Sequence, residues 1–414
     1  MVYQKSKIIN TLDNIILFSL YALIFFFPVS KALIEVTSTI AIICFIIKKL
    51  LRRDGLPSTS LNLPIFIYLA VCFVSVFTSS NFQISSRIFW GKVIQEILFF
   101  FVVADILSDE RRMRNFIYIF FLSAAIVGID GIYQYFTHKD LLRNRPDLGI
   151  PRIYASFGTP NDFGAYLITL LPFLIVSFFV KWRARIFSYL HPALFLLAFT
   201  CLVLSVSRGA WLGFISSVLF LGVWIPSVAV FFIILVLLFL FIKPFFHPAV
   251  SERLGNLFNF FAPEFTNDAG SIERKIFWAA GWKMFIARPW IGLGLGTFMF
   301  NFKEYVASDY LYGPSYAHNC YLQMLTENGI IGLVSFLLIP AVFFYAGIKL
   351  MRVREKVFFW YILLASLAAV LGYSVQMFVD TNIYSLDLGM LFWVLLGIGA
   401  AAMNNIRPET VTPK

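Results

Sequence analysis

The stretch at residues 187–243 decides the fold; it reads FSYLHPALFLLAFTCLVLSVSRGAWLGFISSVLFLGVWIPSVAVFFIILVLLFLFIK. It contains three apolar runs, at 187–205, 209–225 and 227–243. Each run is close to the length of about 20 residues that a helix needs to cross a bilayer. In the Ile225-Pro226-Ser227 junction, the proline is expected to stop one helix and the serine to cap the next. The stretch therefore predicts three consecutive transmembrane helices.

Nine further apolar stretches extend this pattern over the rest of the chain. They lie at 14–30, 32–49, 62–80, 88–107, 115–136, 161–180, 328–348, 357–379 and 388–404. Of the 414 residues, 60% are hydrophobic and 13% are charged, and this charged fraction is about half that of a soluble domain. The composition excludes a soluble enzyme and a disordered chain. We predict an all-α polytopic membrane protein with about twelve transmembrane helices.

Two long segments interrupt the series of apolar stretches. The first is 137–160; the second, 244–327, is far longer than a connection needs, which is typical of a functional loop. Within it, the run 275–285 is weakly amphipathic and predicts a helix lying at the membrane surface. We expect three parts: transmembrane helices 1–9 over residues 1–243, a periplasmic loop domain with amphipathic helices over 244–327, and helices 10–12 with a cytoplasmic tail over 328–414.

The net charge of +11 follows the expected membrane topology. If the N-terminus is cytoplasmic, short cytoplasmic loops such as 48–53 and 181–185 carry clusters of lysine and arginine, in agreement with the positive-inside rule. Both termini are then cytoplasmic, and the two long segments lie outside. We expect the clustered cations to contact anionic lipid headgroups, so membrane lipid, and no nucleic acid, is a predicted partner.

The sequence lacks the patterns that common cofactors require. It contains no Asp-x-Asp and no His-Glu-x-x-His, and its four cysteines are scattered, so neither a metal site nor a disulfide framework is predicted. The nucleotide-binding pattern Gly-x-x-x-x-Gly-Lys is also missing. The run Gly292-Leu293-Gly294-Leu295-Gly296 has the wrong spacing for a dinucleotide fingerprint and predicts a tight turn with close backbone approach. We therefore expect no cofactor.

Charged residues within or beside apolar stretches are candidates for function, because a charge at membrane depth is costly. Lys92 and Glu96 lie four residues apart in one stretch, and hence on one helix face, so we expect them to point into the bundle or to pair with each other. Arg208 lies at the junction of two apolar runs, where its guanidinium fork suits a phosphate. The alternative is that Arg208 only anchors a helix end at the interface.

Two further candidates lie in the long segment. Arg274 follows Ser271-Ile272-Glu273 at an apparent helix N-terminus, and its simpler interpretation is a solvated surface charge pair with Glu273. His318 is embedded in the run 316–323, which is rich in hydrogen-bonding side chains. The ordinary titration range of histidine suits proton transfer near neutral pH. A structural histidine with a satisfied partner is the alternative for His318.

Four segments together resemble the O-antigen ligase superfamily of bacterial inner-membrane glycan transferases. They are Tyr154–Asn161, Ser207–Gly213, Pro289–Phe298 and His318–Gln323, the last followed by Glu327-Asn328-Gly329. The set in this order is more specific than any single motif. These motifs lie between residues 154 and 332, and the predicted twelve-helix topology extends the resemblance over the whole chain.

The resemblance implies a GT-C-type transferase in the bacterial inner membrane, with its active site on the periplasmic face and with neither metal nor nucleotide. Its donor would be a glycan on undecaprenyl pyrophosphate. In the family, arginines at the positions of Arg208 and Arg274 are held to bind the pyrophosphate, and the histidine matching His318 is held to be catalytic. An acidic residue near the last periplasmic turn matches Asp380. The supporting candidates are Asn319, Tyr321 and Gln323.

The chemistry of these residues agrees with such a donor. Two arginines beside a low-dielectric cavity can stabilise a leaving pyrophosphate in place of Mg²⁺, and His318 can deprotonate the acceptor hydroxyl, with inversion of the anomeric centre. The resemblance favours an O-antigen ligase that transfers the glycan to lipid A–core. O-antigen or exopolysaccharide polymerases and protein O-glycosyltransferases with the same donor are alternatives. A lipid-linked glycan transporter is an alternative of another class, but the polar residues concentrate in outer loops, which favours an enzyme acting at one face.

Overall fold

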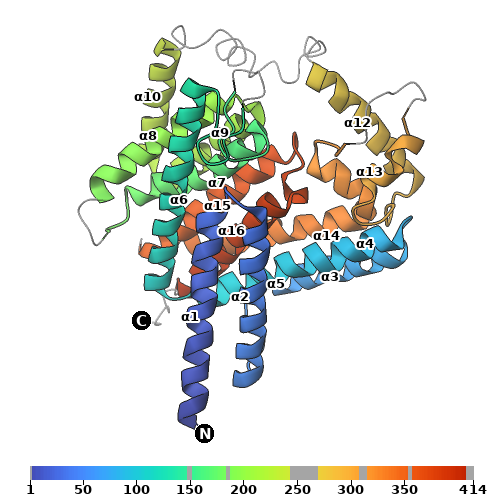
Figure 1. The fold of residues 1–414 in the computed structure, drawn as a ribbon, viewed down its shortest axis with the longest axis horizontal. Helices are drawn as coiled ribbons and strands as arrows, with labels where there is room; N and C mark the ends of the chain where they lie inside the picture. Colours follow the sequence, from blue (N-terminus) through green and yellow to red (C-terminus); the bar gives the residue numbers. More distant parts are fainter. Residues whose placement is uncertain are drawn as a thin grey trace, which may run out of the picture.

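The computed structural model describes residues 2–146, 152–182, 187–242, 269–306, 315–352 and 357–406, and within these ranges it is helical without strands. Figure 1 shows the arrangement. The α-helices are α1 (Val2–Phe26), α2 (Lys31–Arg52), α3 (Asn62–Phe77), α4 (Phe82–Ile88), α5 (Ile94–Ile106), α6 (Glu110–Thr137), α7 (Pro160–Ser177), α8 (Phe187–Ser205), α9 (Arg208–Trp224), α10 (Pro226–Ile242), α12 (Ala269–Ala287), α13 (Phe298–Asn301), α14 (Cys320–Met351), α15 (Phe358–Gln376) and α16 (Leu386–Asn405). Three short turns complete the described part: the π-helical η1 (Phe89–Val93) and the 3-10 helices η5 (Phe302–Glu304) and η6 (Asn382–Tyr384).

Six helical segments are long and apolar enough to cross a membrane, so the chain is a polytopic membrane protein, as predicted. They are Lys5–Phe26, Glu110–Thr137, Pro160–Ser177, Cys320–Met351, Phe358–Gln376 and Leu386–Asn405. Helices also cover the other predicted stretches, but the count of about twelve spans and the GT-C class stay predictions. The basic residues 183–185 and the part of the long segment at 243–268 lie outside the described residues.

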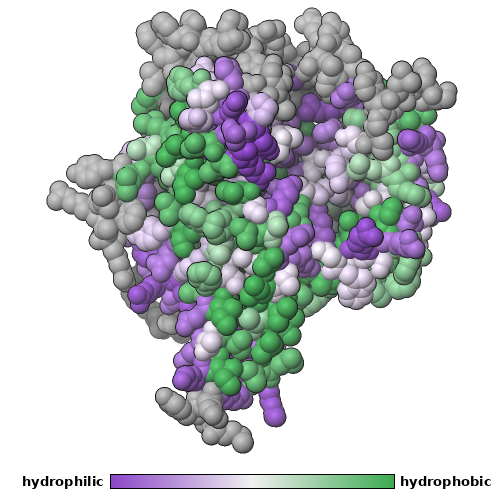
Figure 2. Space-filling model, viewed as in Figure 1, coloured by the Kyte–Doolittle hydropathy of each residue, from purple (hydrophilic) through white to green (hydrophobic). Residues whose placement is uncertain are grey.

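The helices α7, α15 and α16 form the centre of the bundle (Figure 1). Helix α15 packs on α7, α9 and α16, and nearly every residue of α16 is buried. Helices α1 and α2 form a hairpin at the side of this core, where large apolar side chains such as Phe18 (74% exposed) face outward. Figure 2 shows these hydrophobic side chains along the lower part of the molecule. An apolar surface of this extent suits contact with lipid.

A buried ion network near the C-terminal end of α2 shows that one expected lipid contact is wrong. Lys48 and Lys49 belong to the loop cluster that was expected to contact lipid headgroups. Instead, Lys48 is 3% exposed, and its Nζ lies 2.7 Å from a carboxylate oxygen of Asp13 and 2.7 Å from one of Asp105. The Nζ of Lys49 lies 2.8 Å from the second oxygen of Asp105. These ion pairs join α1, α2 and α5, and removing one partner of such a buried pair costs about 3–5 kcal/mol.

Helix boundaries differ from the prediction at two places. Pro226 is the first residue of α10, so Ser227 lies inside the helix and does not cap it. The physical reason is that proline has a fixed φ and no N–H, which suits the first helical position. The helix expected from residue 328 begins at Cys320, because the Asn319 side chain accepts the N–H of Leu322 at 3.0 Å and caps it.

Candidate active site

The candidate site lies at the end of the bundle where α7, α9 and α14 begin and α15 ends, here called the site end. Residues 376–380, which begin with the last residue of α15, form its centre. The amide of Gln376 donates to the carbonyl of Asn161 at 3.1 Å, and the N–H of Cys320 donates to the carbonyl of Met377 at 2.9 Å. The Ser207 hydroxyl donates to Oδ1 of Asn161 at 3.0 Å. The starts of three helices are therefore bound around one short segment.

His318 and Asp380 face each other at the site end. Nδ1 of His318 lies 3.6 Å from Oδ1 of Asp380, and the imidazole side chain is 35% exposed. This distance exceeds that of an ordinary hydrogen bond, although contacts in a catalytic site often shorten when substrate binds. A carboxylate on the Nδ1 side orients the ring and leaves Nε2 to accept a proton. The pair therefore has the arrangement of a general base and its orienting carboxylate.

Backbone contacts fix the position of Asp380. Its Oδ1 accepts the N–H of Thr381 at 2.8 Å. Its carbonyl accepts both the N–H and the thiol of Cys320, each at 3.2 Å. Because Cys320 is the first residue of α14 and follows His318 by two positions, the same contacts hold Asp380 beside His318.

Arg208 begins α9, and the start of α9 packs on the segment that carries Asp380. A Cβ at Gly209 would lie 2.4 Å from Cγ2 of Val379, so only glycine allows this approach. Arg208 is half-buried. It is the chain neighbour of Gly209, and Asp380 is the chain neighbour of Val379. The first turn of a helix also carries unpaired N–H groups and partial positive charge, which suit an anion. The structure thus brings the start of α9 and His318 to one segment.

Helix α12 places Arg274 one turn before a residue that contacts His318. The ring of Phe277 lies 5.9 Å from the imidazole, and the indole N–H of Trp278 donates to the carbonyl of Ala317 at 2.9 Å. Arg274 is half-buried. The predicted start of this helix at Ser271 is wrong by two residues, since α12 begins at Ala269. The predicted helix over 275–285 is confirmed, whereas its location at the membrane surface stays a prediction.

The three supporting candidates hold the loop around His318 together. Asn319 caps α14, as described above. The Tyr321 hydroxyl donates to the carbonyl of Ser374 at 2.8 Å. Gln323 accepts the N–H of Ala317 at 3.2 Å and donates to a carboxylate oxygen of Glu327 at 3.1 Å. Each of these side chains has a partner within the protein, so their geometry indicates positioning of His318.

The glycine-rich run confirms the predicted close backbone approach and binds α12 to α14; we call residues 289–298 the clasp. Within α14, Gly329 has a φ of 67° and interrupts the helix. A Cβ at Gly292 would lie 2.4 Å from the carbonyl of Glu327, and one at Gly329 would lie 2.3 Å from that of Trp290. The buried carboxylate of Glu327 accepts the N–H of Gly296 at 2.9 Å. The two chain segments are therefore interlocked at this point.

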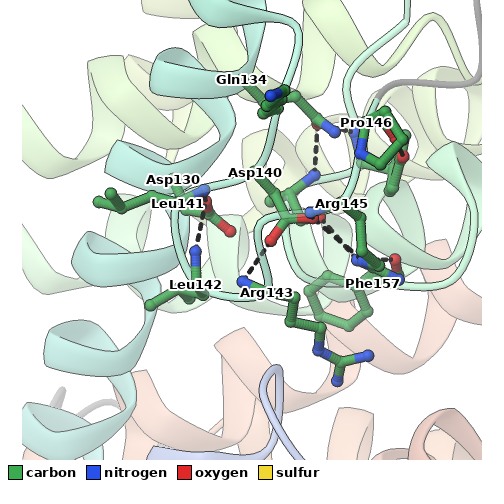
Figure 3. Close-up of polar contacts among 12 residues, drawn as sticks. Asp130, Gln134, Asp140, Leu141, Leu142, Arg143, Arg145, Pro146 and Phe157 are labelled. Atoms are coloured by element: carbon green, nitrogen blue, oxygen red, sulfur yellow. Dashed lines mark hydrogen bonds and ion pairs between the residues drawn. The ribbon is translucent and has the colours of Figure 1, made fainter.

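The segment after α6 is held by a framework of buried hydrogen bonds (Figure 3). Asp140, 1% exposed, accepts Nε of Arg145 at 3.0 Å. Arg145 in turn donates through Nη2 to the carbonyl of Phe157 at 2.8 Å. Gln134, on α6, accepts the N–H of Tyr154 at 2.8 Å. These bonds fix residues 154–157 against the end of α6 and the segment that follows it.

Arg152 is a site-end residue that the sequence analysis did not select. Its Nε donates to the carbonyl of Ser205 at 3.0 Å, and its Nη2 donates to Oδ1 of Asn161 at 3.0 Å. It therefore links the ends of two helices close to Arg208. Its position two residues before the Tyr154–Asn161 motif was the signal in the sequence that could have identified it.

Tyr384 lies in the turn that follows Asp380. Desolvation raises the pKa of the Tyr384 phenol, which therefore stays protonated. Among the described residues, no three His, Cys, Asp or Glu side chains form a group that could hold a metal ion.

Comparison with known families agrees with this arrangement. Residues 193–337 match a family model described as O-antigen ligase. This match confirms the resemblance to the O-antigen ligase superfamily, and the matched residues include Arg208, Arg274 and His318. A search of curated proteins found no match.

Proposed function

Because residues 193–337 match the O-antigen ligase family in a polytopic membrane protein, we propose that the chain transfers a glycan from undecaprenyl pyrophosphate to lipid A–core. The family match supports a ligase- or polymerase-type function in O-antigen assembly. The proposed donor, acceptor and residue roles go beyond that match. The observation that carries them is the contact of 3.6 Å between His318 and Asp380, on the segment against which the start of α9 packs.

In the proposed reaction, Nε2 of His318 takes the proton from an acceptor hydroxyl while the oxygen attacks the anomeric carbon. The new glycosidic bond forms as the bond from the anomeric carbon to the pyrophosphate oxygen breaks, so the configuration inverts. Asp380 stabilises the imidazolium that results. Arg208 and Arg274 bind the leaving pyrophosphate, and charge-assisted bonds from guanidinium groups are well suited to phosphate oxygens. No metal takes part in this proposal.

The proposed location is the periplasmic face of a bacterial inner membrane. The distribution of cations along the sequence supports cytoplasmic termini, and this topology places the site end on the opposite side. The residue ranges 1–243, 244–327 and 328–414 are kept as proposed divisions of the chain. A lipid-linked donor and a lipid-linked acceptor would both reach such a site from the outer leaflet.

The test is transfer in vitro with purified protein in lipid vesicles. Undecaprenyl-pyrophosphate glycan and rough lipopolysaccharide are supplied, and the product is separated by mass. The proposal predicts one glycan added to lipid A–core, and loss of that product in His318→Ala. Longer glycans on the lipid carrier would identify a polymerase, and glycan on a supplied acceptor protein would identify a protein O-glycosyltransferase. Movement of intact donor across the vesicle without a covalent product would identify a transporter.

A further inference from the structure

A cavity lies beside the turn that follows Asp380. Its volume is about 50 Å³, and η6 supplies part of its wall through Ile383 and Tyr384. Most of the other lining residues are apolar or aromatic, but Lys92, Glu96 and Glu327 also line it. Room of this size holds roughly three waters, so charged groups can be solvated here although the surrounding core is apolar.

Lys92 contacts the turn from the side of this cavity. Its Nζ donates to the carbonyl of Ile383 at 3.0 Å and lies 5.7 Å from the centre of the Tyr384 ring, within reach of a cation–π interaction. Cys320 contacts the same turn through the carbonyl of Asp380. The residues 380–384 are therefore held at one end by α14 and at the other by Lys92.

The helix that carries Lys92 departs from α geometry at this point. Lys92 lies in the π-helical turn η1, between α4 and α5, and such turns are frequent at functional sites. Glu96 follows four residues later and lines the same cavity, as the sequence predicted for this pair. It is 6% exposed, and its Oε1 has no hydrogen-bond partner within the described part of the chain. Among the described residues Lys92 and Glu96 do not form an ion pair. The ammonium group of Lys92 instead contacts the carbonyl of Ile383 in the turn.

Burying these charges needs a compensating role. Glu96 and Glu327 line the same cavity as Lys92, so the side chain that donates to the carbonyl of Ile383 lies among carboxyl groups in the interior. An apolar side chain at this position would avoid the cost of desolvation but could not hold the turn. The geometry points to a role in ordering residues 380–384.

We propose that Lys92 is a positioning residue for the His318–Asp380 pair, acting through the carbonyl of Ile383 and the ring of Tyr384. This inference rests on the proposed function. Without the ammonium, the turn is held only by the contacts around Cys320, and the Asp380 carboxylate loses its fixed distance from Nδ1. Donor binding is unaffected, since the arginines that bind the pyrophosphate lie on α9 and α12.

The test compares Lys92→Met with wild type in the vesicle assay. We expect kcat to fall roughly 10- to 100-fold, the loss typical of a displacement of about 1 Å in a catalytic group, with KM for the donor unchanged. Lys92→Arg, which keeps a charged donor, should recover part of kcat. Lys31→Met is the matched control, because Lys31 is also at the site end but pairs with Asp387 at 3.5 Å; its kcat should stay at the wild-type value.

Amide hydrogen exchange gives a readout that does not depend on activity. In Lys92→Met, amides of residues 380–385 should exchange faster than in wild type, while those of residues 139–145 should not change. If Lys92→Met does not fold, Lys92→Leu, which also lacks a donor, replaces it, with the same expected losses. The inference is overturned if Lys92→Met keeps the wild-type kcat, or if a higher donor KM accounts for its lower activity. Unchanged amide exchange at residues 380–385 also overturns it. Failure of the proposed function is a different result: wild type then gives no transfer that depends on His318, whereas the exchange comparison still decides whether Lys92 orders the turn.

Discussion

Replacing Asp380 by asparagine tests the central contact of the candidate site. The two side chains have nearly the same shape, so the change removes the charge and leaves the packing. A carboxylate favours the imidazolium that forms when His318 takes a proton, whereas an amide does not. The asparagine amide can also donate to Nδ1, which would place the ring hydrogen on Nε2 and prevent Nε2 from accepting a proton. Both effects reduce the rate of transfer.

The size of the loss follows from the distance and the exposure. Two unit charges 3.6 Å apart interact by about 4.6 kcal/mol at an effective dielectric constant of 20, and by about 1.2 kcal/mol in water. Because the His318 side chain is 35% exposed, solvent screening moves the value towards the lower figure. About 1.4 to 2.7 kcal/mol is therefore expected. This corresponds to a roughly 10- to 100-fold lower kcat, before any further loss from the altered ring tautomer.

The assay measures kcat and donor KM for Asp380→Asn, for His318→Ala and for the double variant. If the two residues act as one unit, the double variant is no slower than His318→Ala alone. Asp387→Asn is the matched control, since Asp387 is a second carboxylate at the same end of the bundle and its contact is to Lys31. If the fold losses in kcat of the two single variants multiply in the double variant, the residues do not act as one unit. Equal losses of kcat in Asp380→Asn and Asp387→Asn would also refute the proposed role of Asp380.

Three further predictions concern the same site. Arg208→Lys should lose most transfer although the charge is kept, because a bidentate fork is replaced by a point charge; folded variant with wild-type activity would reduce Arg208 to a helix anchor. EDTA should leave transfer intact, because the proposal assigns the leaving-group charge to arginines; loss that Mg²⁺ or Mn²⁺ restores would contradict this. His318→Ala should bind donor normally but lose turnover by about 10²- to 10⁴-fold. Substantial turnover in His318→Gln would show that His318 only orders its loop.

The helical parts of the fold could be predicted because apolar length is a strong signal. The close approach at Gly292 was also predictable, since alternating glycines leave few other interpretations. The π-helical turn that carries Lys92 was not, because nothing in the local residues distinguishes it from an α-helix. The helical turns before Gly329 were missed for another reason. They are polar, and the clasp stabilises them through tertiary contacts that local propensity does not record.

The residues of the site were easier to select than to place. Arg208 is conspicuous as the sole cation in a long apolar stretch, and His318 stands out by its polar neighbours. The segment ending at Asp380 packs on Gly209 and lies beside His318, but it is distant from both in sequence, so only the resemblance indicated it. Arg152 escaped selection because an arginine in a polar segment is unremarkable until Ser205 and Asn161 are seen around it. The expectation of lipid contacts for Lys48 failed because its aspartate partners lie on other helices.

The contact between His318 and Asp380 has a consequence for biosynthesis. The clasp and its partner in α14 are complete once residue 331 has been made, so the part of the chain that carries His318 can reach its folded shape early. Asp380 is added only after α15 has been made. A ribosome that stops within α15 would therefore release a membrane-inserted chain that has the histidine but lacks its carboxylate. The pair of His318 and Asp380 can therefore form only after synthesis has passed α15.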